Sequence, residues 1–193
     1  MSKTTFDMSV SLDGYVRRAD PSPEEPLGVR GEQLHRWAFG DDERDHHVMA
    51  EGGQGTGAVI AGRRTYDDSI RFWGADGPTG ARRLPVVVVT HEPPADSPRD
   101  GVYRFVTGGI EAALRDAREA AAGKNVTIMG GADLGRQFLA ARLIDELSIH
   151  LVPVLLGSGT PLFTGLPDGH LQLEPVAAIQ SPNATHLRFR VVR

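Results

Sequence analysis

The chain has 193 residues, a formal net charge of −4 and no cysteine, and 40% of its residues are hydrophobic. This length suits one domain spanning residues 1–193. The absence of cysteine excludes disulfides, thiolate zinc sites and cysteine nucleophiles. The negative charge argues against nucleic acid or an acidic membrane as a partner. No apolar run is long enough for a signal peptide or a membrane span, so we expect a cytoplasmic protein.

The first half of the chain alternates predicted strands and helices. Residues 6–11 alternate apolar and polar side chains, which is typical of a half-buried strand, and Asp13-Gly14 then marks a turn. Weak helical patterns follow at 32–39 and 41–49, and residues 52–57 form a glycine-rich connection. An apolar strand over 56–61 then leads through Gly62 into a helix.

The second half ends in strands. It contains an apolar run at 85–90, typical of a strand covered on both faces, then a strand at 102–106 and an amphipathic helix at 108–122. A strand–Gly-Gly–helix unit spans 125–139, and three further strands are predicted near 147–155, 171–179 and 185–192. The pattern predicts a three-layer α/β/α fold with a mostly parallel sheet and an antiparallel C-terminal edge.

Three predicted strands end in polar or glycine-rich turns, at Gly62-Arg63-Arg64-Thr65, Thr90-His91 and Gly130-Gly131. The carboxyl ends of parallel strands share one edge of a sheet, where ligands bind. Two helix N-termini and an arginine pair at this edge favour a ligand with several phosphates, such as a dinucleotide with an extra ribose phosphate. The alternatives are ordinary βα turns and a solvated pair of surface arginines.

Common catalytic and nucleotide motifs are absent from the sequence. Gly130-Gly131-x-x-x-Gly135 does not match the G-x-G-x-x-G fingerprint, and there is no P-loop, H-E-x-x-H or G-x-S-x-G motif. We therefore expect no metal site.

Five groups of residues, in order, resemble the dihydrofolate reductase-like superfamily. They lie at 9–14, 62–66, 88–91, 128–139 and 144–159, and read SVSLDG, GRRTY, VVTH, IMGGADL with QFL, and IDEL through PVLLGSG. The chain is most similar to stand-alone relatives of the reductase domain, the C-terminal domain, of the bifunctional riboflavin-biosynthesis deaminase-reductase. It lacks the deaminase zinc motif.

This resemblance implies an NADPH-dependent oxidoreductase that reduces a carbonyl, an imine or a ring C=N. It implies that Gly130 and Gly131 approach the pyrophosphate and ribose, and that Arg63 or Arg64 binds the 2′-phosphate. The full set of implied cofactor-binding residues is Gly62, Arg63, Arg64, Thr65, Thr90, His91, Gly130, Gly131, Ala132, Asp133 and Leu134. Ala132 replaces a third glycine, which indicates that this position has no need of a positive φ.

On the substrate side, the resemblance and the need for a proton donor point to Asp13 and Asp42 as catalytic candidates, with Asp13 and Trp37 lining the substrate pocket. The alternatives are a turn residue at Asp13 and a helix cap at Asp42. Basic residues that could hold a phosphoribosyl group are present at Arg17, Arg18 and Arg30.

The leading hypothesis is a reductase of a pyrimidine- or pteridine-like heterocycle, with 5-amino-6-(5-phosphoribosylamino)uracil as the first substrate to test. One alternative is a non-catalytic NADPH-binding or sensor protein on the same fold. Another is a reductase of unrelated carbonyl or nitro compounds. The resemblance also implies a homodimer.

Overall fold

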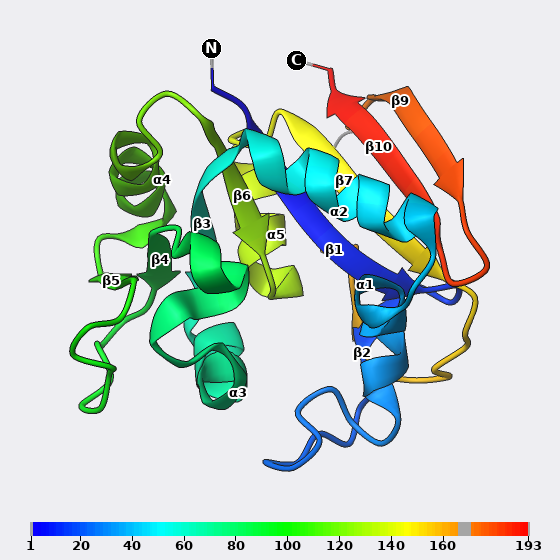
Figure 1. Ribbon diagram of the computed structural model, residues 1–193, viewed down its shortest axis with the longest axis horizontal. Helices are drawn as coiled ribbons and strands as arrows, with labels where there is room; N and C mark the ends of the chain where they lie inside the picture. Colours follow the sequence, from blue (N-terminus) through cyan, green and yellow to red (C-terminus); the bar gives the residue numbers. More distant parts are fainter. Residues whose placement is uncertain (1, 166–170, 193) are drawn as a thin grey trace.

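Runs of aliphatic and β-branched residues build a central eight-stranded sheet, shown in Figure 1. The computed structural model describes residues 2–165 and 171–192. The strands of this sheet are β1 (Thr4–Ser11), β3 (Thr56–Gly62), β4 (Val86–Val89), β5 (Tyr103–Val106), β6 (Asn125–Met129), β7 (Glu146–Val152), β9 (Leu173–Gln180) and β10 (Thr185–Val191). A separate two-stranded ribbon pairs β2 (Tyr15–Arg17) with β8 (Thr160–Pro161).

The strand order is β5-β4-β3-β6-β1-β7-β10-β9. The strands from β5 to β7 pair in parallel, whereas β10 runs antiparallel to both β7 and β9. The predicted fold class, a mostly parallel sheet with an antiparallel C-terminal edge, is therefore confirmed.

Helices cover both faces of the sheet. The α-helices are α1 (Arg36–Phe39), α2 (Glu43–Gly55), α3 (Arg63–Trp73), α4 (Gly109–Ala120) and α5 (Ala132–Ala140). Two 3₁₀ segments are η1 (Gly31–His35) and η2 (Gly74–Arg82). In Figure 1, α2 crosses in front of the sheet and α5 lies behind it. No helix among residues 2–165 and 171–192 is long and apolar enough to cross a membrane.

Strand β1 separates the core from the opposite face by strict alternation. Phe6 and Val10 belong to the main apolar core, together with buried side chains of α4 and α5. Asp7 and Ser9 point to the other face, as successive side chains of a strand must. Strands β6 and β7 divide their side chains in the same way. The sheet therefore has an apolar face, and a polar face over its central strands.

Helix α2 differs from the expected glycine-rich connection, because it continues through Gly55. Each helical glycine disfavours the helix by about 1 kcal/mol relative to alanine. The missing side chains let neighbours approach, since a Cβ on Gly53 would lie 3.0 Å from Arg82 Nη1, and one on Gly55 would lie 3.1 Å from Asn125 Nδ2. The Thr56 hydroxyl donates a hydrogen bond to the Gly52 carbonyl over 2.8 Å and closes the last turn. Tertiary contacts thus extend the helix beyond its local preference.

Candidate functional site

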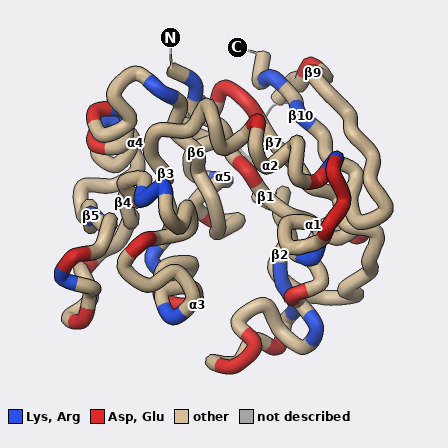
Figure 2. Tube along the Cα trace, in the orientation of Figure 1, with Lys and Arg blue, Asp and Glu red and all other residues tan. Residues whose placement is uncertain are grey.

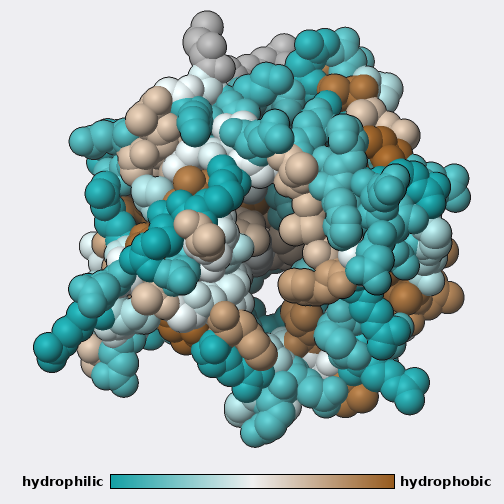
Figure 3. All heavy atoms as spheres, in the orientation of Figure 1, coloured by the Kyte–Doolittle hydropathy of each residue, from teal (hydrophilic) through white to brown (hydrophobic). Residues whose placement is uncertain are grey.

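A large cleft opens on the polar face of the sheet, between α3 on one side and η1, α1 and α2 on the other. Figure 3 shows it as a hollow between these two halves of the molecule. Its volume is about 2020 Å³. A site for one drug-sized ligand has roughly 300–1,000 Å³, so the cleft has room for a dinucleotide and a second molecule.

All eleven residues implied to bind the cofactor line this one cleft. They come from the ends of β3, β4 and β6 and from the first turns of α3 and α5. The parallel pairing of β3 with β4 and β6 brings these strand ends to one edge. Their predicted proximity is therefore observed, whereas their role as cofactor ligands stays a prediction. We call Gly62–Thr65 with Gly130-Gly131 the glycine wall.

Gly130 and Thr65 make the closest approach in the glycine wall. Gly130 has φ +73° and Gly131 has φ +91°, a region that L-side chains rarely adopt. A Cβ on Gly130 would lie 2.3 Å from Thr65 Cγ2, whereas one on Gly131 would meet nothing nearer than 3.6 Å. Ala132 opens α5 and is absent from the positive-φ residues, as the sequence indicates. The wall thus exposes backbone beside two helix N-termini, which suits a phosphate group.

The two arginines of the glycine wall differ in their contacts. Arg63 Nε donates to both carboxylate oxygens of Asp67 over 2.8 and 2.9 Å, and its Nη1 donates to the Glu92 carbonyl over 2.5 Å. Arg64 is exposed at the cleft and makes no hydrogen bond or ion pair with any residue that the structure describes. Its charge acts on Asp68 from a distance, but its N–H donors are unused among the described residues and can bind an anion.

Three other predicted cofactor residues have structural partners or stand at the edge. Thr90 is buried and its hydroxyl bonds with Glu92, which closes the turn after β4. His91 is exposed at the rim of the cleft. Asp133 forms an ion pair with Arg136 one helical turn away.

Trp37 forms part of the cleft wall, in agreement with its predicted place at the pocket. Its side chain is buried, and its indole Nε1 donates to Ser9 Oγ over 2.9 Å. Its ring lies over the imidazole of His150 with 4.1 Å between centroids, and meets the edge of His186 at 4.9 Å. The indole thus covers two histidines.

Asp13 lies outside the cleft, so its expected role at the substrate pocket needs correction. Its carboxylate accepts hydrogen bonds from Ser11 Oγ over 2.5 Å, Leu156 N over 3.1 Å and Gly157 N over 2.7 Å. The hydrogen bond from Ser11 is the main reason that the pKa of Asp13 is lowered. Asp13 therefore joins the turn after β1 to the loop after β7, which is the turn role that the sequence left open.

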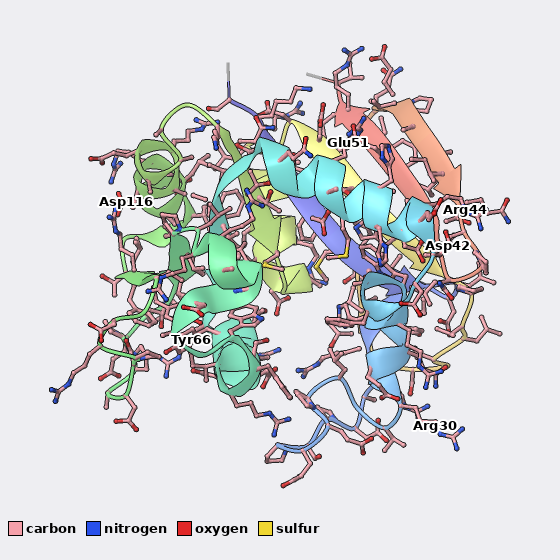
Figure 4. All side chains as sticks on the ribbon, in the orientation of Figure 1. Arg30, Asp42, Arg44, Glu51, Tyr66 and Asp116 are labelled. Atoms are coloured by element: carbon pink, nitrogen blue, oxygen red, sulfur yellow. The ribbon has the colours of Figure 1, made fainter. Side chains whose placement is uncertain are left out.

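Asp42 also lies outside the cleft and caps α2. Its carboxylate accepts from the backbone of Arg44 over 3.0 Å and pairs with the Arg44 guanidinium at 2.8 Å. Figure 4 shows both side chains at the outer end of α2, and Figure 2 shows the acidic stretch around them. Hydrogen bonds from Arg44 lower the pKa of Asp42 to about 2. Asp42 is therefore a helix cap, paired with Arg44 at a position outside the cleft.

A chain of four ionisable side chains, which the sequence reading missed, lies beneath Trp37. We call Asp7, His150, His186 and Asp45 the histidine floor. His150 Nε2 lies 3.3 Å from Asp7 Oδ2, His150 Nδ1 lies 2.8 Å from His186 Nδ1, and His186 Nε2 lies 2.8 Å from Asp45 Oδ1. The four residues come from β1, β7, β10 and α2.

Burial and hydrogen bonds set the charges of the histidine floor. Burial raises the pKa of Asp7, but the charge and the hydrogen bond of His150 outweigh it and leave the pKa lowered. Burial likewise raises the pKa of Asp45, but hydrogen bonds from Asn183 and other neighbours lower it overall. Burial lowers the pKa of His186, only partly countered by Asp45. Both carboxylates are therefore ionised, and His186 is neutral at neutral pH.

The basic residues considered for a phosphoribosyl group are mostly engaged or distant. Arg17 lies 3.7 Å from Asp68, and Arg18 lies 3.3 Å from Asp20. Figure 4 shows Arg30 pointing outward, away from the cleft. Arg17 lines the cleft, and Arg18 and Arg30 do not.

The residues that line the cleft fit NADPH. Gly130 packs so closely against Thr65 that a Cβ there would clash, and without side chains Gly130 and Gly131 present their backbone to the cleft. The guanidinium of Arg64 lines the same cleft. Within the described ranges, no three His, Asp or Glu side chains are grouped so that they could hold a metal ion.

Comparisons with known proteins agree with this geometry. A family model described as the RibD C-terminal domain matches residues 2–187. An uncharacterized protein, YwjB of Bacillus subtilis (strain 168), is 32% identical over 161 residues, which cover 83% of this chain and 82% of that protein.

Two solved structures show the same fold at low identity. A putative riboflavin biosynthesis protein from Shewanella sp. PV-4 has a TM-score of 0.74 and 23% identity, and the match covers 99% of each chain. A dihydrofolate reductase from Enterococcus faecalis, complexed with NADP(H), has a TM-score of 0.60 and 12% identity over 98% of this chain and 96% of its own. The fold is therefore dihydrofolate reductase-like.

Proposed function

Because this chain belongs to the RibD C-terminal domain family, we propose that it is an NADPH-dependent reductase of a pyrimidine- or pteridine-like heterocycle. The observation that carries the proposal is the convergence of all eleven expected cofactor residues on one cleft. The cleft also has room for a second molecule beside the dinucleotide. When bound, NADPH supplies a hydride to that molecule.

In this proposal the glycine wall holds the dinucleotide. Gly130 and Gly131 present backbone to the pyrophosphate and ribose, and the Thr65 hydroxyl beside them donates to the pyrophosphate. Arg64, which makes no hydrogen bond or ion pair with any described residue, binds the 2′-phosphate. Arg63 instead holds the first turn of α3 against the loop after β4.

The substrate lies over the central strands beside Trp37. This part of the cleft offers a buried indole, the carboxylate of Asp7 and the hydroxyl of Thr127. A flat ring with several N–H and C=O groups matches such a mixture of apolar wall and polar floor. The riboflavin-pathway aminopyrimidine is the first substrate to test. Of the three arginines considered for a phosphoribosyl group, Arg17 lines the cleft and is paired with Asp68, so pterin and dihydrofolate belong in the same panel.

The role of Arg64 is tested by comparing NADPH with NADH, since only NADPH has the extra phosphate. We expect Arg64→Ala to weaken NADPH binding about 10- to 100-fold, as for the loss of one charged contact of roughly 1.5–3 kcal/mol, and to leave NADH binding unchanged. Cofactor fluorescence during titration measures both affinities. Arg104→Ala, an exposed arginine on β5 outside the cleft, is the matched control. Equal losses for the two cofactors would show that the phosphate lies elsewhere.

Turnover tests the enzyme claim itself. NADPH consumption is followed with the aminopyrimidine, a pterin and dihydrofolate. Oxidation of NADPH with any of them supports a reductase. Tight NADPH binding without reduction of any heterocycle would instead favour a non-catalytic NADPH-binding protein. The predicted homodimer is tested separately by the mass of the protein in solution.

A further inference from the structure

The histidine floor reaches the cleft at one end only. The side chains of His150, His186 and Asp45 are 3%, 4% and 0% exposed, whereas that of Asp7 is 36% exposed. Asp7 faces Met129 in the register of β1 and β6, and Met129 directly precedes the glycine wall. The partly exposed carboxylate therefore stands next to the part of the cleft assigned to the cofactor, with three buried groups behind it.

The hydrogen bonds of the floor have one consistent direction, which begins at Asp45. Asn183 Nδ2 donates to Asp45 Oδ2 over 2.9 Å, and an ionised carboxylate can only accept, so His186 Nε2 must carry a proton. Because burial keeps the His186 ring neutral by lowering its pKa, its Nδ1 carries no proton and can only accept a hydrogen bond. The 2.8 Å contact between the two Nδ1 atoms holds one proton, which must belong to His150.

In this arrangement, Nε2 is the nitrogen of His150 that can bind and release a proton. It faces the ionised Asp7 carboxylate at 3.3 Å, and a proton on Nε2 converts that contact into a charged hydrogen bond. The Trp37 ring, 4.1 Å away between centroids, covers the imidazole. His150 is thus built to hold a proton directly behind an exposed carboxylate.

We propose that Asp7 is the catalytic acid of this cleft, and that His150, oriented by His186 and Asp45, is the positioning residue that supplies its proton. The proposal rests on the proposed reductase function. As hydride reaches the carbon of a substrate C=N bond, the π bond breaks and the nitrogen takes a proton from the Asp7 carboxyl. Asp7 receives its proton from His150 Nε2, so the step ends with Asp7 ionised, His150 neutral, the heterocycle reduced and NADPH oxidised. Water in the open cleft returns a proton after the product leaves.

Few other charged groups face this pair, so their proton equilibrium is well isolated. His35 of η1 lies close enough to feel the charges of His150 and Asp7, and burial lowers its pKa, so it is neutral at neutral pH. Further along α2, Glu51 pairs with Arg188 of β10 at 2.9 Å. Ser148 of β7 donates a hydrogen bond to Asp7 and carries no charge.

The proton positions are tested first, by ¹⁵N NMR of the histidine rings in the cofactor-free protein between pH 5 and about 9. We expect His186 to stay neutral with its proton on Nε2, and His150 to hold one proton on Nδ1 toward His186 and a second on Nε2 toward Asp7. In Asp7→Asn, His150 should lose the Nε2 proton, whereas Asp42→Asn, on the outer end of α2, should leave it in place. A His150 ring that is neutral in the wild type, or unchanged in Asp7→Asn, would overturn the proposal.

Kinetics then test the transfer. Asp7→Asn should lower kcat for heterocycle reduction about 100-fold or more, the usual contribution of a general acid, with NADPH affinity unchanged. His150→Gln should lower kcat without raising KM and should remove the fall of kcat at alkaline pH. Wild-type kcat in Asp7→Asn would overturn the role of Asp7. If no heterocycle is reduced by the wild type, the proposed function fails, and the NMR result still decides whether the floor holds a transferable proton.

Discussion

The glycine wall and the histidine floor face the same cleft, but the wall presents backbone groups and the floor presents ionisable side chains. The wall offers backbone N–H groups at the starts of α3 and α5, with Gly130 and Gly131 left bare. The floor offers ionisable side chains from four separate elements, three of them buried. The wall suits phosphates, which many proteins bind with backbone N–H groups at helix N-termini. The floor is a chain of hydrogen-bonded ionisable side chains. If the proposed functions hold, the difference teaches that cofactor binding and proton transfer in this cleft can be altered by separate substitutions.

The largest expected effect on cofactor binding is at the glycine wall. Gly130→Ala would place a Cβ 2.3 Å from Thr65 Cγ2 at a residue with φ +73°. We expect NADPH affinity to fall roughly 100-fold, equivalent to about 2.8 kcal/mol, because Thr65 and the backbone must both shift. Titration of cofactor fluorescence measures the loss.

Gly123→Ala separates backbone strain from crowding at Gly130. Gly123 has φ +87° but a Cβ there would have nothing within 4 Å, and the residue lies outside the cleft. This control should lose about 1–3 kcal/mol of stability through strain alone and keep its NADPH affinity. Unchanged NADPH affinity in Gly130→Ala would remove Gly130 from the binding site.

An effect of similar size, but on stability rather than binding, is expected in the floor. Asp45→Ala leaves the buried His186 Nε2 and Asn183 Nδ2 without their acceptor. Each buried donor that loses its acceptor destabilises a protein by about 1–3 kcal/mol. Chemical denaturation measures this loss, with the exposed Glu43→Ala in the same helical turn as control. If the two variants are equally stable, the buried contacts of Asp45 contribute little.

The smallest effect is expected at Asp42, three residues before Asp45. Asp42→Asn keeps a side-chain acceptor for the helix cap and lies outside the cleft, so turnover and NADPH affinity at pH 7 should match the wild type. Ionisation of Asp42 contributes stability above its unfolded pKa of 3.8, and this contribution is lost as the pH falls through the folded value of about 2. Melting temperatures of the two proteins should therefore converge in strong acid. A large loss of turnover at neutral pH would return Asp42 to the list of catalytic candidates.

The glycine wall could be predicted because its signal is local in sequence. Gly62-Arg63-Arg64-Thr65 and Gly130-Gly131 each lie between an apolar strand and a helix, and parallel strands bring such junctions to one edge. The sheet was predictable for the same reason, from apolar runs such as Val86–Val89. Which of Arg63 and Arg64 has unused donors could not be predicted, because it depends on a contact between Arg63 and Glu92, 29 residues away.

The histidine floor could not be predicted, because its contacts join distant residues. Asp7 and His150 are 143 residues apart, and Asp45 and His186 are 141 apart. Alternation along a strand shows which residues share a face, but not which strands are neighbours. A weak signal did exist in α2, where Asp45 and Val48 share the inward side of the helix. The resemblance and the need for a proton donor pointed to Asp42 instead, which the structure places at the helix cap.

The strict alternation of β1 has a consequence for how faithfully this site is assembled. If β1 paired with β6 and β7 one residue out of register, the carboxylate of Asp7 would enter the apolar layer under α4 and α5, and Phe6 would be left in the open cleft. An unpaired carboxylate in an apolar layer is strongly unfavourable. The polar residues of the site thus disfavour incorrect strand pairing. The register that buries Phe6 in the apolar core also places Asp7 beside His150.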